Sequence, residues 1–257
     1  MELFHPMSFD VNACGMTNVG LIRENNEDYW GIAEKERFYV LADGMGGHRA
    51  GEVAARELVT ELCRYASEEF DAEQSIEDAA SSLMEAIEKS NRKIFEMGSS
   101  SQALKGMGTT LCCLYFHPKG VIWAHVGDSR IYLLRKHRLS QLTKDHSLVS
   151  DMMESGQLDE NDASTYQYKN ILTKAVGTDL FLEPTLEIDD YKDGDRYLLC
   201  SDGLSDLLLK REMEEIMNRN IHVKECCKEL IKAALEKGGI DNVTVLVVEV
   251  HESEDLF

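Results

Sequence analysis

The sequence predicts an α+β fold in which antiparallel sheets pack together and helices cover their outer faces. The first observation is a succession of segments rich in β-branched and aromatic residues, separated only by short turns, which is typical of hairpin-linked strands. The second is that a pair of helical segments precedes these strands and further helices follow them, whereas a doubly wound sheet alternates strands and helices singly. Because the 257 residues include no linker-like stretch, we expect one domain over residues 1–257.

The chain begins its regular structure with a strand and two helices. Residues 37–43 form an apolar run that ends at the glycine-rich turn GMGG, which indicates a buried strand. Apolar residues at helical spacing then predict helices over about 51–65 and 75–97. Ser75 and Asp78 have the spacing of a capping box, so the second helix should begin there.

Three strands are predicted after the helices, over residues 109–116, 120–128 and 129–136. A turn containing Pro, Lys and Gly separates the first two, and Gly127 with Asp128 separates the last two. We therefore expect three consecutive antiparallel strands.

The second half of the chain combines a polar insertion with further strands and helices. Residues 143–182 are polar, and we expect them to form a mostly helical surface insertion. A strand is predicted over 195–203 and a helix over about 222–237. Residues 238–250 should close the chain as a turn and a buried strand.

The charge of the chain excludes several classes of partner. Lys and Arg total 27 against 47 Asp and Glu, which gives a formal net charge of -20 at pH 7. A negative field repels nucleic-acid backbones and anionic membranes, so a nuclease or a membrane-surface protein is disfavoured. The seven cysteines show no CxxC spacing, and no apolar run is long enough to span a bilayer. These features predict a cytoplasmic protein without a zinc site and without membrane insertion.

Acidic residues stand where apolar strands turn. They are Glu27 with Asp28, Asp43, Asp202 and Asp241. A single Asp-Gly is usually only a turn, but several carboxylates that each project from a strand end could share one cation site. Oxygen ligands without His or Cys favour Mg²⁺ or Mn²⁺ over zinc.

Six ordered motifs of the chain resemble those of a known family. The motifs are RENNED, VLADGMGGH, GMGTT, VGDSRIYLL, LCSDGL and GGIDNVTVLVV. Together they resemble the motif series of the type 2C metal-dependent protein phosphatases (the PPM family), in the compact bacterial form. The resemblance runs from about Asn18 to Val250, which is nearly the whole chain.

The resemblance implies a β-sandwich of two antiparallel sheets flanked by helix pairs, with a flap subdomain over about 145–180. It also implies a centre of two Mn²⁺ or Mg²⁺ ions at one edge of the sandwich. By motif, Asp43 would bridge both ions and the Gly44 carbonyl would bind one of them. Asp202 and Asp241 would complete the ligands of the first ion.

The remaining motif positions carry supporting roles in the family. Glu27 would approach the second ion through water. Asp28 would hold the metal ligands in place without binding an ion itself. Asp128 would contribute to a third, weaker metal site, although the residue also suits a hairpin turn. Arg23 would hold the substrate phosphate, because a guanidinium donates paired hydrogen bonds to phosphate oxygens. An ordinary surface salt bridge is the alternative for Arg23.

The activity implied by the resemblance is hydrolysis of phosphoserine and phosphothreonine in proteins by a hydroxide that bridges the two ions. The expected partners are phosphorylated proteins, namely a Ser/Thr kinase and its targets, and nothing in the sequence indicates more than a monomer. A pseudophosphatase that serves as a regulatory binding module is one alternative. A phosphatase acting on a small regulatory protein is another.

Several positions leave the mechanism open. Animal members have a histidine directly after the Asp-Gly, where this chain has Met45, so His48 is a candidate proton donor to the leaving group. Thr109 and Thr110 are expected to favour a strand, and His146 is expected to be structural. In the flap, 168–170 reads Tyr-Lys-Asn where many relatives have His-Pro-x-Asn, which puts flap conformation and selectivity in doubt.

Overall fold

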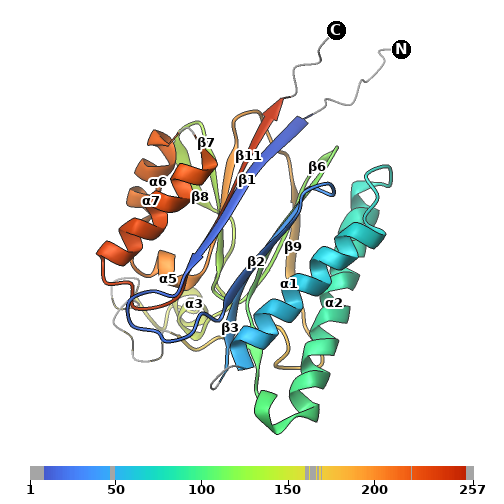
Figure 1. The fold of residues 1–257 in the computed structure, drawn as a ribbon, viewed down its shortest axis with the longest axis vertical. Coiled ribbons are helices and arrows are strands. Elements are labelled where there is room, and N and C mark those ends of the chain that lie inside the picture. The colour runs from blue at the N-terminus through green and yellow to red at the C-terminus, as the bar shows by residue number, and fades with distance from the viewer. Residues whose placement is uncertain are drawn as a thin grey trace.

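Two antiparallel sheets form the centre of the molecule, as Figure 1 shows. The computed structural model describes residues 9–46, 50–159, 162, 166, 168, 170–220 and 222–252. The first sheet contains, in spatial order, β1 (Phe9–Asn18), β11 (Val243–Glu252), β10 (Arg196–Cys200), β7 (Arg130–Arg135) and β8 (Arg138–Gln141). The second contains β2 (Asp28–Ala33), β3 (Phe38–Met45), β5 (Leu111–His117), β6 (Gly120–Val126) and β9 (Thr185–Asp189), with the short β4 (Gly108–Thr109) paired to β3.

Helix pairs cover the two outer faces of the sandwich (Figure 1). The helices α1 (Ala50–Glu69) and α2 (Ile76–Ser100) pack on the second sheet. On the first sheet lie α6 (Lys210–Arg219) and α7 (Val223–Glu236), preceded by the short α5 (Asp202–Ser205). A third apolar layer fills the space between the sheets. The α+β class, the sandwich and its flanking helix pairs are therefore confirmed.

Each helix buries the face that its apolar spacing defines. In α1 the buried positions include Ala54, Leu58 and Leu62, which recur every four residues. The helix α2 begins where its cap was predicted: the Asp78 amide donates to Ser75 Oγ at 3.1 Å. The second half of the capping box differs, because Asp78 Oδ2 accepts from the Ser75 hydroxyl at 2.7 Å. Both helices extend a few residues beyond the predicted ends.

The strands β6 and β7 do not form the predicted hairpin. The end of β6 pairs with β5 in one sheet, whereas Arg130 at the start of β7 pairs with Cys200 of the other sheet. Gly127 has a φ of 97°, and this left-handed conformation turns the chain from one sheet to the other. Asp128 is thus not a hairpin residue but lies at the crossing point between the sheets.

The predicted mostly helical insertion over 143–182 is wrong for the residues that the structure describes. Within this range α3 (Leu148–Glu154) is a short helix, whereas residues 171–182 are turns, bends and isolated bridges. Gly177, with a φ of 84°, packs against Ile94 so closely that an added Cβ would lie 2.3 Å from its Cγ2. The polar composition was read as helical, but too few apolar side chains are present to give a helix a buried face.

The edge strands of both sheets were not predicted from the sequence. They are β1, β2, β8 and β9. Most of their residues are partly or fully exposed, so these strands lack the buried apolar runs of the central strands. None of the helices in the described ranges is both long and apolar enough to cross a membrane.

Candidate active site

The predicted acidic residues come from strand ends at one edge of the sandwich. Asp28 begins β2 and lies directly opposite Asp43 in the register of β2 with β3. Asp202 follows the end of β10, and Asp241 precedes the neighbouring β11. The Ser201 hydroxyl donates to Asp28 Oδ2 at 2.8 Å and so links the two sheets at this edge. The fold therefore brings together four carboxylates that are far apart in the sequence.

Asp28 is the most deeply buried of these carboxylates. Its side chain belongs to a residue that is 5% exposed, and its Oδ1 has no hydrogen-bond partner among the described residues. Burial raises the pKa of Asp28 to about 6, although hydrogen bonds such as the one from Ser201 oppose the shift. A buried oxygen without a donor is costly unless something positive satisfies it.

The main chain of Asp43 is held by two threonines. The Asp43 amide donates to Thr110 Oγ1 at 2.9 Å, and the Thr109 hydroxyl donates to the Asp43 carbonyl at 2.9 Å. The Thr110 amide donates to the same carbonyl at 2.8 Å. Thr110 Oγ1 also lies 2.7 Å from the buried Ser129 Oγ. The sequence analysis assigned these threonines to strand formation only, but their hydroxyls also fix Asp43.

The carboxylates raise one another's pKa. The pKa values of Asp43 and Asp202 lie well above the ordinary aspartate range, first because of burial and then because of neighbouring carboxylates. Asp43 is affected by Asp28 and Asp202, and Asp202 is affected by Asp128 and Asp241. Burial, followed by the charge of nearby Asp145, raises the pKa of Asp128 to about 6. A divalent cation would remove this repulsion.

The donor set fits Mg²⁺ or Mn²⁺, although the side chains are not arranged as finished ligands. Within the described ranges, no group of three or more His, Cys, Asp or Glu side chains is already placed to hold a metal ion. Oxygen donors, the unsatisfied Asp28 Oδ1 and the mutually raised pKa values all favour a hard dication at this edge.

Glu27 and Gly44 lie where β3 meets the start of α1. The Gly44 amide donates to the Glu27 carbonyl at 3.1 Å. A Cβ added to Gly44 would lie 2.2 Å from the Gly51 carbonyl oxygen, and one added to Gly51 would lie 2.5 Å from Glu27 Oε2. Only glycine at both positions lets the helix start approach the Glu27 side chain this closely. Burial raises the pKa of Glu27, and Arg23 opposes that shift.

Arg23 reaches into the acidic site from the loop between β1 and β2. Its Nη2 donates to Asp241 Oδ2 at 2.7 Å while the side chain remains 56% exposed. The hydrogen bond with Asp241 raises the pKa of Arg23, and the charges of Asp202 and Glu27 act in the same direction. A permanently charged, exposed guanidinium beside the carboxylates is suitably placed to meet an incoming phosphate.

Asn242 organises the same loop and was missed in the sequence analysis. Its Oδ1 accepts from the Glu27 amide at 2.8 Å. Its Nδ2 donates to the carbonyls of Val19 and Asn25, both at 2.9 Å. The residue is 6% exposed, so the loop that carries Arg23 and Glu27 is fixed from inside the fold. The motif GGIDNVT contains this signal, because a polar amide directly precedes an apolar strand.

His146 couples the predicted flap to the Asp128 segment. Its Nδ1 accepts from the Gly127 amide at 3.2 Å, and its own amide donates to the Gly127 carbonyl at 2.8 Å. The imidazole stacks on His125 at 4.4 Å between ring centroids. Burial, followed by the nearby His125, lowers the pKa of His146 to about 4, so the ring is neutral near pH 7. His146 therefore has the expected structural role, and what it stabilises is the turn before Asp128.

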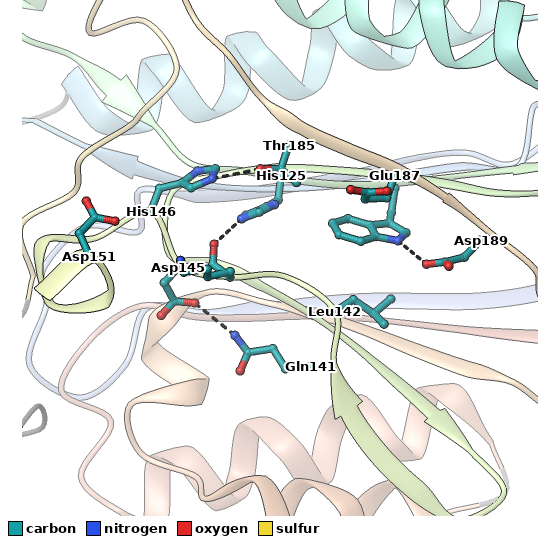
Figure 2. Close-up of a pocket in the computed structure, with 11 residues that line it drawn as sticks. His125, Gln141, Leu142, Asp145, His146, Asp151, Thr185, Glu187 and Asp189 are labelled. Atoms are coloured by element: carbon teal, nitrogen blue, oxygen red, sulfur yellow. Dashed lines mark hydrogen bonds between the residues drawn. The ribbon is translucent and has the colours of Figure 1, made fainter. Parts of the chain in front are cut away.

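A pocket of about 610 Å³ lies beside this histidine pair, as Figure 2 shows. It opens between the edges of the two sheets and is lined by residues of β6 and β9, such as Trp123 and Glu187, by the end of β8, and by the segment after β8 that includes Leu142. Trp123 Nε1 donates to Asp189 Oδ2 at 2.8 Å along its wall. The carboxylates of the candidate metal site do not line it. His48 lies outside the described residues.

Comparison with known proteins identifies the family. The family model described as Protein phosphatase 2C matches residues 23–237. This chain belongs to the protein phosphatase 2C family. Its serine/threonine phosphatase relative named stp, from Listeria monocytogenes, is 40% identical over 236 residues, which is 91% of this chain and 93% of the relative. The protein phosphatase PhpP of Streptococcus pneumoniae is 35% identical over 243 residues, 93% of this chain and 97% of the relative.

Solved structures of protein phosphatase 2C type share the whole fold. The serine/threonine phosphatase PstP/Ppp of Mycobacterium tuberculosis superposes with a TM-score of 0.86 at 35% identity, over 94% of this chain and 99% of that one. A PstP catalytic domain described in complex with two manganese ions gives a TM-score of 0.85 at 35% identity, over 95% of this chain and 100% of that one. The chain is accordingly a hydrolase of the metal-dependent protein serine/threonine phosphatase type.

Proposed function

We propose that this phosphatase dephosphorylates phosphoserine and phosphothreonine of proteins at a centre of two Mn²⁺ or Mg²⁺ ions held at the acidic edge of the sandwich. One observation carries the assignment to this edge. Carboxylates from both sheets raise the pKa values of Asp43 and Asp202, and neither residue forms an ion pair with a basic side chain in the part of the chain that the structure describes. The manganese-bound PstP structure supports the choice of metal, since that protein has the same fold.

The proposed ligands of the ions are oxygen atoms. They are the carboxylates of Glu27, Asp43, Asp202 and Asp241 and the backbone carbonyl of Gly44. Asp43 is the bridging candidate, because its main chain is fixed by Thr109 and Thr110 and its charge acts on carboxylates from both sheets. Asp28 would keep these ligands in place through its register with Asp43 and its bond from Ser201. Asp128 would serve a third, weaker site.

The two ions would lower the pKa of a water molecule and neutralise phosphoryl oxygens. The protein's own contribution is to position and orient the substrate. Arg23 would exchange its bond with Asp241 for paired hydrogen bonds to the phosphate. Because Asn242 fixes the Arg23 loop before substrate arrives, little conformational entropy is lost on binding. His48 remains a candidate donor of the proton to the leaving group.

The proposed cellular partners are a Ser/Thr kinase and its protein targets, and we propose that the chain acts as a cytoplasmic monomer. The family resemblance and the bacterial relatives support this assignment. We also propose a single catalytic domain over residues 1–257 with a flap at 145–180. The isolated β-bridge between Thr109 and Val176 supports a flap that is anchored to the catalytic core, and the bridge between Ser147 and Leu172 joins two parts of the flap itself.

The pseudophosphatase alternative gains no support. Each acidic residue expected from the family motifs is present at the same edge of the fold. The curated relatives of similar length are themselves named as phosphatases.

Hydrolysis of para-nitrophenyl phosphate by chelator-treated protein tests the proposal. We expect Mn²⁺ or Mg²⁺ to restore activity in wild type but not in Asp202→Ala. Glu187→Ala is the matched control, because it removes an exposed carboxylate of β9 away from the acidic edge. A folded wild type that remains inactive with every dication would overturn the enzyme assignment.

A further inference from the structure

Exposed aliphatic side chains gather beside Arg23. Leu21 is 64% exposed and Ile22 is 69% exposed, in the loop between β1 and β2. Ile240 is 52% exposed in the loop between α7 and β11, and Val19 is 36% exposed. We call these four residues the rim patch. Single exposed aliphatic residues are ordinary, but four within two adjoining loops at a catalytic edge indicate a contact surface.

The two loops of the rim patch are bonded to each other. The Leu21 amide donates to the Gly239 carbonyl at 2.7 Å. A Cβ added to Gly20 would lie 2.2 Å from the Asp241 carbonyl oxygen, which shows how closely the loops approach. Arg23 then crosses to Asp241 at 2.7 Å. The rim patch therefore borders the proposed phosphate contact directly.

The backbone beneath the rim patch is fixed. Asn242 Nδ2 donates to the carbonyls of Val19 and Asn25, and the Gly20 amide donates to Asn18 Oδ1 at 2.9 Å. Gly20 has a φ of 82°, which this tight turn requires. The aliphatic side chains thus project from a backbone that needs no further ordering. Such preorganisation reduces the entropic cost of binding.

The kind of group that would bind to the rim patch follows from the substrate that must reach Arg23. A phosphorylated residue held by Arg23 brings its neighbours with it, and residues of an extended segment are about 3.3 Å apart along the chain. Ile22 and Leu21 are one and two residues from Arg23, so a side chain beside the phosphorylated residue would meet them. The exposed Glu24 and the partly exposed Glu27 leave this edge negative, which disfavours an acidic neighbour.

We propose that the rim patch binds an aliphatic or aromatic side chain adjacent to the phosphorylated residue, and so selects phosphoprotein segments with apolar flanks. The inference rests on the proposed phosphatase function and on Arg23 as the phosphate contact. Burial of one apolar side chain against exposed Leu and Ile should favour the matching substrate about tenfold in kcat/KM.

The test uses two phosphothreonine peptides that differ only in the residues beside the phosphothreonine, Leu in one and Ser in the other. With Mn²⁺ present, wild type should prefer the Leu peptide about tenfold in kcat/KM. The double variant Leu21→Ser/Ile22→Ser should lose this preference. Ile240→Ser, in the second loop, should reduce it independently. Phe181→Ser is the control. Phe181 is an exposed apolar residue, and its segment is bonded to α2 instead of to these loops.

Para-nitrophenyl phosphate separates the possible failures, because it has no flanking residues. Its hydrolysis by the double variant should stay within about twofold of wild type, which also shows that the variant is folded. Equal rates on both peptides in an active wild type would overturn the rim-patch inference alone. A preference that persists in both loop variants would also overturn it. Absence of hydrolysis of every substrate by wild type would instead overturn the proposed function.

Discussion

Two groups of buried carboxylates in this protein are neutralised in different ways. Away from the acidic edge, the buried Asp195 and Glu249 and the partly buried Asp145 each have an arginine: Arg135 bonds Asp195 at 2.6 Å, Arg196 bonds Glu249, and Arg130 bonds Asp145 at 2.6 Å. At the edge, Asp43 and Asp202 meet mainly other carboxylates, and their pKa values rise far above the ordinary range because of burial and these neighbours. The strand β10 joins the two situations, since Asp195 precedes it and Asp202 follows it.

The difference between the two groups of carboxylates indicates where a cation would bind. A protein normally pairs each buried carboxylate, because an unpaired buried charge is strongly destabilising. Arg130, which lies nearest the edge, is already committed to Asp145 through three hydrogen bonds. Asp43 and Asp202 are therefore left for a ligand of positive charge, whereas Asp241 at the same edge is bonded by Arg23.

The largest effect is expected from removing an edge carboxylate. Asp43→Asn should lower the Mn²⁺-dependent kcat for para-nitrophenyl phosphate by about a thousandfold or more, because it removes the proposed bridging ligand. Asp195→Asn is the matched change in the arginine-paired group and should leave kcat per folded molecule nearly unchanged. Steady-state kinetics with both proteins checks the contrast. Comparable losses in the two variants would contradict it.

The metal-free protein should become less stable as pH rises. Since the folded-state pKa of Asp28 is about 6 against an ordinary 3.8, the folded state holds this proton more tightly than the unfolded chain. The resulting stabilisation, about 3 kcal/mol, is complete below pH 4 and is lost as pH rises through about 6. Asp128, also with a pKa of about 6, contributes with the same sign.

Thermal unfolding in chelator between pH 4.5 and 7.5 measures this loss. The high net negative charge destabilises the protein in the same direction, so Asp28→Asn is needed for comparison. The variant should show a clearly shallower dependence on pH. If the pH dependence of unfolding were the same in Asp28→Asn as in wild type, the loss of stability would not come from the raised pKa of Asp28.

Breaking an arginine-paired group should cost stability and not metal dependence. Arg135→Met leaves Asp195, which is 1% exposed, without its guanidinium. We expect the free energy of unfolding to fall by about 2 kcal/mol, allowing for the partial exposure of Arg135. Urea unfolding measures the change. Arg64→Met, in a pair on the surface of α1, should show no measurable change. If Arg135→Met altered the Mn²⁺ requirement, the distinction between arginine-paired and metal-binding carboxylates would be wrong.

A smaller effect is expected from the threonine that holds Asp43. Thr110→Val keeps the shape of the side chain but removes the acceptor of the Asp43 amide and the contact with Ser129. The loss should be about 1 kcal/mol of stability and about tenfold in kcat. Thr60→Val, whose hydroxyl donates within α1, is the control. A variant with full activity would show that Asp43 needs no such support.

The sequence predicted the central elements and the acidic residues well. The strands β3, β5 and β10 are continuous apolar runs, and α1 and α2 have clear helical spacing, so local pattern suffices for them. That Asp28 and Asp43 face each other, by contrast, depends on the register of β2 with β3, and the sequence analysis did not predict β2. The ordered family motifs supplied the site residues that local pattern could not.

The errors share a physical origin in long-range pairing. Gly127 and Asp128 resemble a hairpin turn locally, but β7 pairs with β8 and with β10, more than fifty residues away, instead of with β6. The positioning roles of Thr110 and Asn242 depend on contacts with Asp43 and Glu27, which no local pattern reports. The prediction of a mostly helical flap fails because polar composition does not distinguish a helix from an anchored loop.

Calorimetric titration of Mn²⁺ into chelator-treated protein tests the central claim, which is that the carboxylates of the acidic edge bind divalent cations. The account predicts that wild type and Arg135→Met bind two ions per chain and that Asp43→Asn loses this binding. Wild type that binds no Mn²⁺, or Asp43→Asn that binds as many ions as wild type with the same affinity, would contradict it.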